Sequence, residues 1–347
     1  MRITLIDDSI PFDGATPKIK PLGGAEKAFV YLSETLAARG HDVTAVNQCD
    51  AYSELNGVTW LPFDAPRPLE SEVLIAFRKP SLLEEADSVD LRILWLWGPA
   101  PLPDQAANQV LLERYMPTLV FLGETHRQSW KSQRNFKEAI IVPGVTDAYL
   151  EIKDNQSEPE PIAIITTHPL HGLQELLQLW LDGIRPRNDR AQLHIYSASL
   201  SRGIETGEVA NRMKDLLSIA GKAQNSGIFI KLPMPDVDMA KIYRYAKLHF
   251  YPMIKTEMYG STLAESQAAG LPALVLAATG DVGAVAERVC NGQSGYIAPD
   301  NAAFINLAAE ILAENSELYW SLHREALTLQ KYRTWHNAAI EFEALWS

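Results

Sequence analysis

Two glutamates in residues 251–272 are the side chains best placed to do chemistry. Glu257 and Glu265 lie eight positions apart in YPMIKTEMYGSTLAESQAAGLP. The pattern predicts an apolar strand, then a loop that holds Glu257 and Gly260, then a helix from about Ser261. The first N–H groups of a helix are unpaired and carry the positive end of its dipole, so this helix start predicts a site for a diphosphate. Gly260 would let the chain approach such a ligand closely.

The two carboxylates indicate a ligand with several hydroxyls. A carboxylate accepts hydrogen bonds from neighbouring hydroxyls, which is what recognition of a sugar or a ribose needs. Glu257 lies in the loop and Glu265 about one turn into the helix, so each would grip a different part of one ligand. Thr262 and Glu265 also fit a capping box, in which Glu265 would only bond back to the helix start. Both interpretations of Glu265 stay open, whereas Glu257 has no obvious local partner.

A second candidate anion site is PLGGAE, residues 21–26, directly before an expected helix. Gly23 and Gly24 would let backbone amides turn toward an anion, and the dipole of the following helix would add to the attraction. The alternative is a flexible loop followed by an ordinary helix start.

Two further segments carry candidate groups. His126, in GETHRQSW, would supply an imidazole, and a helix cap or a surface position is its alternative. Asp236 and Asp238 match a DxD metal-binding pattern, but they precede the helical run MAKIYRYAK, so helix capping is the preferred interpretation.

The elements that must position these residues alternate between short apolar runs and amphipathic stretches, a pattern typical of parallel strands joined by crossover helices. The fold class is therefore α/β. A helix is expected at Ala25–Arg39, closed by Gly40, and another at GLQELLQLWLDGI (172–184). Strands are expected at RITLID (2–7), HDVTAV (41–46), EVLIAF (72–77), RILWLW (92–97), TLVFLG (118–123), AIIVPG (139–144), PIAIITT (161–167), QLHIYS (192–197), GIFIKL (227–232), KLHFYP (247–252) and PALVLA (272–277).

The strand pattern stops in a polar, acidic, proline-bearing stretch and then restarts, which indicates two similar domains. We expect a Rossmann-like domain at 1–152, a linker at 153–160, a second Rossmann-like domain at 161–332, and a terminal helix at 333–347 that packs back on the first domain or stands as an ordinary end. Ligands of open parallel sheets lie beyond the carboxyl ends of the strands, so two such domains would face each other across a binding cleft.

Bulk properties narrow the function. Apolar residues make up 47% and charged residues 21% of the 347, so the chain should fold throughout. The net charge of −12 argues against a nucleic-acid partner.

The cysteines and the apolar runs indicate the cellular location. Cys49 and Cys290 are isolated in the sequence, and we expect both to be reduced thiols. No signal-peptide core or spanning apolar run is present, which favours a cytoplasmic protein. HRQSWKSQRNFK, residues 126–137, alternates basic and aromatic residues in an expected helix and is either a peripheral membrane contact or a solvated face.

The motif around the two glutamates resembles the retaining glycosyltransferases of the GT-B fold, in the group-4 (group 1) class. Their signature is a Glu, seven residues, then a second Glu, and here Glu257 and Glu265 stand with YG (259–260) and AGLP (269–272). SGYIAPDN and VPGVTDAYL also resemble family segments, in the same order. The resemblance implies that Glu257 contacts the transferred sugar, that Glu265 holds the nucleotide ribose, and that Tyr259, Gly260, Ser261 and Thr262 meet the diphosphate. It also implies that Gly23 and Gly24 close over the donor phosphates.

Two departures from the family pattern concern charge and stacking. Thr166 and His171 stand where relatives carry an Arg and a Lys, and an imidazole neutralises a diphosphate less well than those cations. His171 is nonetheless expected to contact phosphate. Trp97 stands where relatives often have a His, and is either a stacking residue or a packed strand residue.

The resulting expectation is an enzyme that moves a sugar from a nucleoside-diphosphate sugar to a glycan or lipid-linked hydroxyl, with retention and without a metal or further cofactor. Its setting would be the synthesis of cell-surface polysaccharide or lipopolysaccharide, at the inner face of the membrane. A nucleotide-sugar epimerase and a non-catalytic nucleotide-sugar or glycan-binding homologue are the alternatives.

Overall fold

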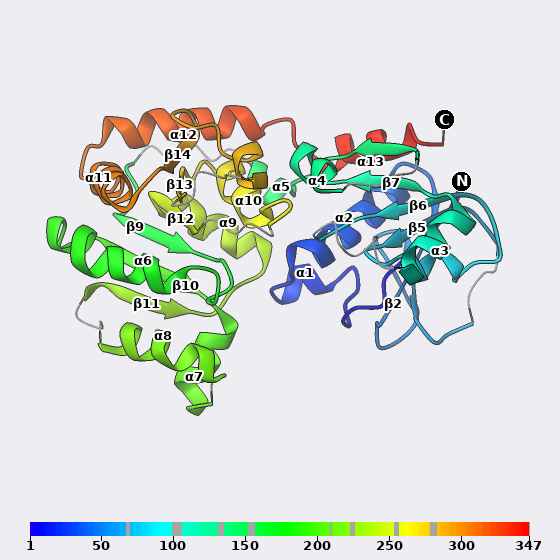
Figure 1. Cartoon of the computed structure of the whole chain (residues 1–347), viewed down its shortest axis with the longest axis horizontal. Coiled ribbons are helices and arrows are strands. Elements are labelled where there is room, and N and C mark those ends of the chain that lie inside the picture. Colours follow the sequence, from blue (N-terminus) through cyan, green and yellow to red (C-terminus); the bar gives the residue numbers. More distant parts are fainter. Residues whose placement is uncertain are drawn as a thin grey trace. The chain divides into compact units, whose positions relative to one another are not determined.

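The computed structural model describes residues 1–66, 70–98, 106–130, 135–151, 157–208, 210–222, 226–252, 257–277 and 283–346. The chain forms two compact units. The first unit comprises Met1–Thr146, Thr256–Tyr259 and Arg333–Ser347, and the second comprises Asp147–Lys255 and Gly260–Tyr332. Each unit is built on its own sheet, as Figure 1 shows. The predicted α/β class, with two parallel-sheet domains, is confirmed.

The first unit is built on an eight-stranded sheet of order β3-β4-β2-β1-β5-β6-β7-β8. Only the β3–β4 pair is antiparallel among the pairs of the described strands. The strands are β1 (Arg2–Ile6), β2 (Asp42–Asn47), β3 (Ser53–Leu55), β4 (Val58–Pro62), β5 (Glu70–Phe77), β6 (Ser88–Trp95), β7 (Thr118–Phe121) and β8 (Glu138–Ile140). The helices are α1 (Thr16–Ile19), α2 (Gly24–Ala38), the 3-10 helix Pro80–Glu84, α3 (Ala106–Tyr115), α4 (Glu124–Ser129) and α13 (Trp335–Glu343).

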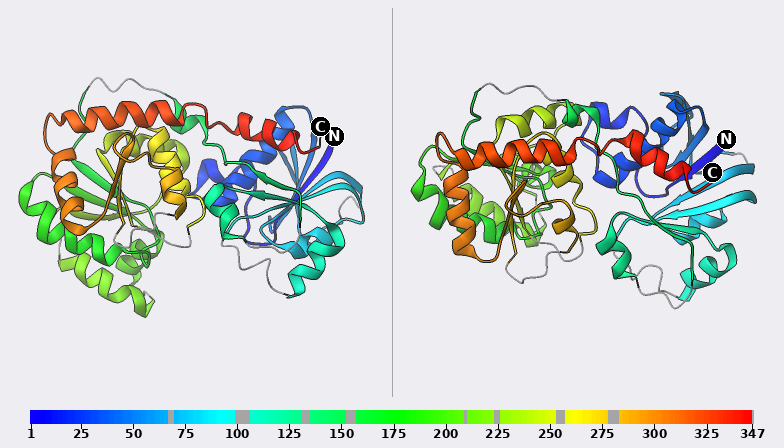
Figure 2. Two further views of the ribbon diagram at one scale, coloured as in Figure 1. Left: turned by 45° about the horizontal axis from the view of Figure 1, so that its top comes forward. Right: turned by 90° about the horizontal axis from the view of Figure 1, so that it is seen from above.

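Helices α2 and α13 pack on each other in this unit although they lie at opposite ends of the sequence (Figure 2). Arg39, directly after α2, donates from Nε and Nη2 to the two carboxylate oxygens of Glu343, at 2.6 and 2.7 Å. Phe342 is fully buried, with its ring 5.1 Å from that of Trp95 on β6. The last helix is therefore part of the first unit's core.

The second unit has a six-stranded, fully parallel sheet of order β11-β10-β9-β12-β13-β14. Its strands are β9 (Ile162–Ile165), β10 (Gln192–Tyr196), β11 (Ile228–Lys231), β12 (Leu248–Pro252), β13 (Ala273–Leu276) and β14 (Gly295–Ala298). Its helices are α5 (Asp147–Leu150), α6 (Leu173–Leu179), a π-helical turn Trp180–Ile184, the 3-10 helix Arg185–Arg187, α7 (Ala198–Thr206), α8 (Asn211–Lys222), α9 (Asp236–Tyr245), α10 (Ser261–Ala268), the 3-10 helix Gly283–Glu287, α11 (Asn301–Ile311) and α12 (Glu317–Gln330).

Alternate side chains of one strand enter separate clusters on the two faces of this sheet. Leu274 of β13 lies in the large core that includes α6 and α11, whereas Val275 lies in a smaller cluster with Leu263 of α10. This is the period-two pattern of a strand buried on both faces, and it explains why the strands read as continuous apolar runs.

Several local expectations need correction. The sequence patterns did not predict α1, β3, β4 or β14. Helix α4 ends at Ser129, so the helix expected over residues 126–137 is shorter, and 131–134 lie outside the described residues. Trp97 lies beyond the end of β6, half-buried against Phe77, Trp95 and Tyr259.

Cys49 is buried and Cys290 is exposed, and both are free thiols. In the part of the chain that the structure describes, no helix combines the length and the apolar character needed to cross a bilayer.

Candidate functional site

Helix α10 begins where the sequence motif predicted a helix start. Its N-cap is Gly260, with φ +72° and ψ 57°, a left-handed conformation that side chains disfavour. The Gly260 carbonyl accepts from the N–H groups of Leu263 and Ala264, at 3.0 and 3.1 Å. The amides of Ser261 and Thr262 precede these and have no carbonyl within the helix to bond. The backbone thus presents amide donors and the positive end of a helix dipole at this point.

The capping box considered for Glu265 does not form. A capping box pairs the N-cap side chain with the third helical residue. Because the N-cap is Gly260, Thr262 is the second residue of α10 and Glu265 the fifth. Helix capping therefore does not account for Glu265.

Glu265 lies in a buried group of acids and tyrosines. The residue is 9% exposed. Burial raises the pKa of Tyr149 and Tyr243 well above the usual value, and the charge of Glu265 raises both further. Tyr149 donates from its hydroxyl to Asp236 at 2.8 Å. This bond joins α5 to α9 beside α10.

The expectation that Asp236 and Asp238 cap a helix is wrong. Pro235 is the N-cap of α9, with no side-chain cap bond. Asp236 is buried against Tyr149, and Asp238 pairs with Lys241 at 2.8 Å. Within the described ranges, no group of three or more His, Cys, Asp or Glu side chains is placed to hold a metal ion.

Glu257 does have a local partner, contrary to the expectation from the sequence. Its Oε1 accepts from the backbone N–H of Tyr259 at 3.2 Å. Tyr259 is buried and donates from its hydroxyl to the Pro143 carbonyl at 2.8 Å, while its ring lies 6.0 Å from that of Trp97. These contacts hold Glu257 and Tyr259 in the first unit, and Gly260 begins the next stretch of the second unit.

The strands β9 and β12 of the second unit are paired neighbours in the parallel sheet, so their carboxyl ends lie side by side. Thr166 follows β9, and α10 follows β12 in the chain. Gly172 lies so near β12 that a Cβ on it would come within 2.6 Å of the Pro252 Cβ. The loop after β9 therefore lies at the same edge of the sheet as the end of β12.

His171 lies exposed in this loop and is not alone there. Its ring centroid is 5.3 Å from that of His168, and its backbone N–H bonds to the His168 carbonyl at 2.8 Å. Burial, and then the neighbouring His171, lower the pKa of His168. His168 is a residue that the sequence analysis passed over, although the spacing HPLH is readable in it.

Gly23 and Gly24 are the N-cap and the first residue of α2 in the first unit. The carboxylate of Glu26 folds back over Gly23, where a Cβ would lie 2.2 Å from Oε2. Glu26 accepts from Arg78 Nη2 at 2.5 Å. A side chain at Gly23 would have to displace only the flexible end of Glu26, and the φ of −64° is open to any residue, so the chain itself does not require glycine here.

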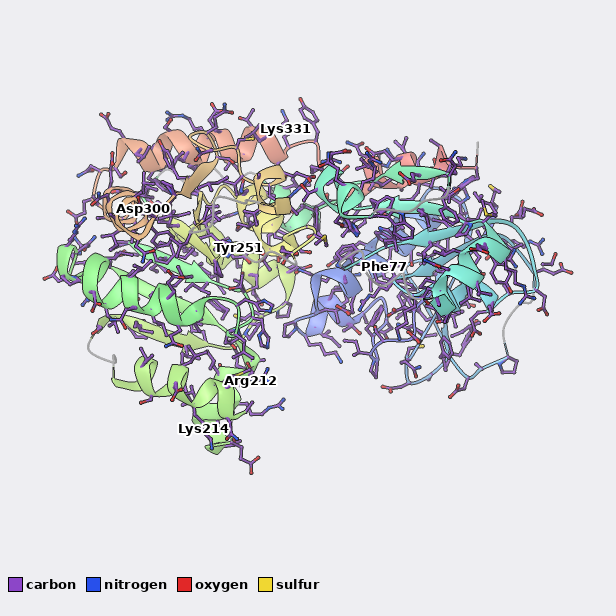
Figure 3. All side chains as sticks on the ribbon, viewed as in Figure 1. Phe77, Arg212, Lys214, Tyr251, Asp300 and Lys331 are labelled. Atoms are coloured by element: carbon purple, nitrogen blue, oxygen red, sulfur yellow. The ribbon has the colours of Figure 1, made fainter. Side chains whose placement is uncertain are left out.

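Arg78 contacts both Glu26 and Asp7 in the first unit, and the sequence analysis missed Arg78 and Asp7. Arg78 follows β5 and has φ +71°, an uncommon value for a residue with a side chain. Its guanidinium carbon lies 4.7 Å from the ring centroid of Phe77, which Figure 3 labels. Its Nε lies 3.9 Å from Asp7 Oδ1. Burial raises the pKa of Asp7, and Arg78 opposes that rise. Both residues directly follow paired strands, β1 and β5, which is the signal that could have found them.

His126 has a structural environment. It is 1% exposed, its Nδ1 accepts from the Leu122 N–H at 3.2 Å, and its Nε2 lies 2.9 Å from the Gly98 carbonyl. With both ring nitrogens engaged by backbone, the side chain ties two loops of the first unit together. The geometry favours this role over the catalytic one expected from sequence.

Comparison with known proteins identifies the fold. WaaG, a glycosyltransferase involved in lipopolysaccharide biosynthesis, is similar at a TM-score of 0.69, with 14% identity over 99% of both chains. Sucrose-phosphate synthase from Thermosynechococcus elongatus is similar at a TM-score of 0.72, with 14% identity over 99% of this chain and 98% of the other. A structure described as trehalose-6-phosphate from E. coli bound with UDP-2-fluoro glucose has a TM-score of 0.67 and 11% identity, over 99% of this chain and 98% of the other.

At these identities the structural likeness establishes the fold, which is that of the GT-B glycosyltransferases. None of the curated protein sequences matches the chain at a significant level. Residues 171–327 match the family model described as glycosyl transferases group 1, and this range contains α10, Glu257, Glu265 and His171. Residues 171–327 are therefore similar to the glycosyl transferases of group 1, on a chain with the GT-B fold.

Proposed function

We propose that this protein transfers a sugar from a nucleoside-diphosphate sugar to an acceptor hydroxyl, with retention at the anomeric carbon and without a metal ion. The observation that carries the proposal is the start of α10. There a left-handed Gly260 is followed by the amides of Ser261 and Thr262, and a buried Glu265 lies one turn further on. An anion-binding helix start next to a carboxylate suits a diphosphate joined to a ribose.

The chemistry assigns a role to each group. The Ser261 and Thr262 amides hold the diphosphate, and Glu265 accepts hydrogen bonds from the ribose hydroxyls. Glu257 orients the transferred sugar. Gly23, Gly24 and His171 contribute to phosphate binding, and preorganised donors of this kind stabilise the charge that develops on the leaving group.

The transfer itself needs no further reactant. The bond between the anomeric carbon and the phosphate oxygen breaks, the acceptor oxygen bonds to the same face of that carbon, and the acceptor proton passes to the released diphosphate. The protein supplies positioning and electrostatic stabilisation.

Similar proteins suggest the biological setting. WaaG acts in lipopolysaccharide biosynthesis, and the trehalose-6-phosphate structure holds a UDP-sugar analogue. We propose a glycan or lipid-linked acceptor in cell-surface polysaccharide or lipopolysaccharide synthesis, on the cytoplasmic face of the membrane.

Thermal stabilisation by UDP, GDP, ADP and dTDP, alone and as sugar conjugates, tests the donor site. A ligand that binds only the folded state adds about 2.7 kcal/mol of stability at 100 times its Kd. We expect one nucleotide to raise the Tm. Glu265→Gln should remove that rise, whereas Glu310→Gln, an exposed carboxylate on α11, should keep it.

Release of the nucleoside diphosphate then separates the candidate functions. A transferase releases it only when an acceptor is added, an epimerase converts the donor without an acceptor, and a binding protein does neither. Nucleotide binding with no acceptor-dependent release across a broad acceptor panel would refute the transferase.

A further inference from the structure

A buried histidine of the second unit links the end of strand β9 to helix α10. His249 is the second residue of β12 and is fully buried, as is Ser266 of α10. The Nε2 atom of His249 is 3.0 Å from Thr166 Oγ1, just past the end of β9. Its Nδ1 is 2.7 Å from Ser266 Oγ. One ring therefore bridges the loop after β9 and helix α10.

The hydrogen-bonding pattern fixes the direction of this chain. Ser266 Oγ donates its single hydrogen to the Leu263 carbonyl at 3.1 Å, so it accepts from His249 Nδ1–H. Nε2 then carries no proton and accepts from the Thr166 hydroxyl, which also hydrogen-bonds with the Tyr243 side chain. Burial lowers the pKa of His249 to about 3, so the ring is neutral near pH 7. Both of its nitrogens are satisfied.

Packing alone does not call for a histidine at this position. The other residues of β12 are apolar or aromatic and buried, and the His249 ring lies 5.8 Å from that of Tyr243 and 5.7 Å from that of Tyr251, labelled in Figure 3. A phenyl ring would fill such a site without the desolvation cost of an imidazole. A fully satisfied buried polar network fixes the geometry of the groups that it joins.

We infer that His249 is a positioning residue for the donor site: through Thr166 and Ser266 it fixes the start of α10 and the adjacent Glu265 relative to the loop after β9. This inference rests on the proposed function, in which Glu265 and the α10 amides bind the sugar donor. His249 itself does not touch the donor. Its contribution is expected in donor affinity, with the acceptor unaffected.

Steady-state kinetics of the full chain test this assignment. His249→Phe keeps an aromatic ring and removes both hydrogen bonds, and we expect the donor KM to rise about tenfold, as the loss of one to two net hydrogen bonds of about 1 kcal/mol each would give. The acceptor KM should stay within twofold of the wild-type value. His249→Gln, which offers an N–H and a carbonyl, should recover most of the donor affinity.

His194→Phe is the matched control. His194 is also a buried histidine in this sheet, but within the described residues its side chain hydrogen-bonds only to Gln192 on the same strand, at 2.9 Å. Its donor KM should stay within twofold of wild type. Should His249→Phe fail to fold, Thr166→Val removes one hydroxyl with little change of shape. It should raise the donor KM about fivefold, the effect of losing one hydrogen bond of about 1 kcal/mol.

The outcomes separate the two levels of the argument. A wild-type protein that neither binds a nucleotide nor turns over a donor would overturn the proposed function. A wild-type enzyme that works, with an unchanged donor KM in His249→Phe or Thr166→Val, would overturn only the positioning role. An equal rise in His194→Phe and His249→Phe would also overturn it, because the effect would then be one of general stability.

Discussion

Single residues decide whether the start of α10 can receive an anion. Gly260 has φ +72°, and a Cβ there would meet only ordinary contacts, at 3.5 Å or more. The glycine is therefore required for its backbone conformation and not for space within the chain.

Gly260→Ala should cost about 1 to 2 kcal/mol of unfolding free energy and weaken nucleotide binding, because the strained cap moves the Ser261 amide. Gly207 is the matched control, since it also has φ +72° and open space around it. Urea unfolding should show similar losses in the two alanine variants, and nucleotide titration should show weaker binding in Gly260→Ala alone. Unchanged nucleotide affinity in Gly260→Ala would remove this helix start from the donor site.

Glu257 is suited to a substitution that changes charge and little else. Glutamine keeps an oxygen that can accept from the Tyr259 N–H, now 3.2 Å from Oε1. Glu257→Gln should therefore leave the fold and the binding of the free nucleotide unchanged. It should lower kcat/KM with the sugar donor about 10- to 100-fold, the cost of one charge-assisted hydrogen bond. Turnover at the wild-type rate would exclude Glu257 from the sugar site.

Among the elements, β12 makes stability depend on pH. The folded-state pKa of His249 is about 3, against 6.5 for a free histidine, because burial disfavours the charged ring. Below pH 6.5 the unfolded chain therefore binds a proton that the folded chain excludes, and stability falls as the pH falls.

Between about pH 6 and 4.5, His249 should contribute a loss of about 1.4 kcal/mol per pH unit. Urea unfolding at a series of pH values checks this, and the slope should be smaller in His249→Phe by that amount. Equal slopes in the two proteins would show that the ring accepts a proton in the folded state. The window stops at 4.5 because carboxylates such as Glu343, whose pKa is about 2, mainly through its bond to Arg39, begin to lose their own contribution below it.

At the scale of the whole molecule, each unit has its own sheet and core, and the chain passes between them more than once. The last helix, α13, belongs to the first unit, where Phe342 is fully buried and Glu343 pairs with Arg39 and lies 3.0 Å from His41. Removal of a buried aromatic residue alone costs about 3–5 kcal/mol.

Truncation after Tyr332 should therefore destabilise the first unit and spare the second. Hydrogen exchange should show faster exchange in β1, β5 and β6, with β9, β12 and β13 close to wild type. A truncated chain with equal protection in both sheets would show that α13 contributes little to the first core. Loss of protection throughout the chain would show that the two units unfold as one.

The sequence by itself determined the fold class and most of the strands. Runs such as EVLIAF and KLHFYP are apolar because their strands are buried on both faces, so the local pattern alone predicts a buried strand. Short elements were harder to predict: β3 has three residues and no buried one, β14 has four, and the four-residue α1 has no repeating apolar face. The start of α10 was readable because a glycine cap is a local feature.

Only the tertiary structure decided which partners the site residues have. His126 bonds to the Gly98 carbonyl, 28 residues away in sequence, and Arg78 bonds to Glu26, 52 residues away. His249 meets Thr166 and Ser266, which are separated from it by 83 and 17 residues. A side chain's role depends on what surrounds it, and parallel strands joined by crossover helices bring together groups that are distant in sequence. Local spacing could therefore suggest candidate residues for the site but not the contacts that hold them in place.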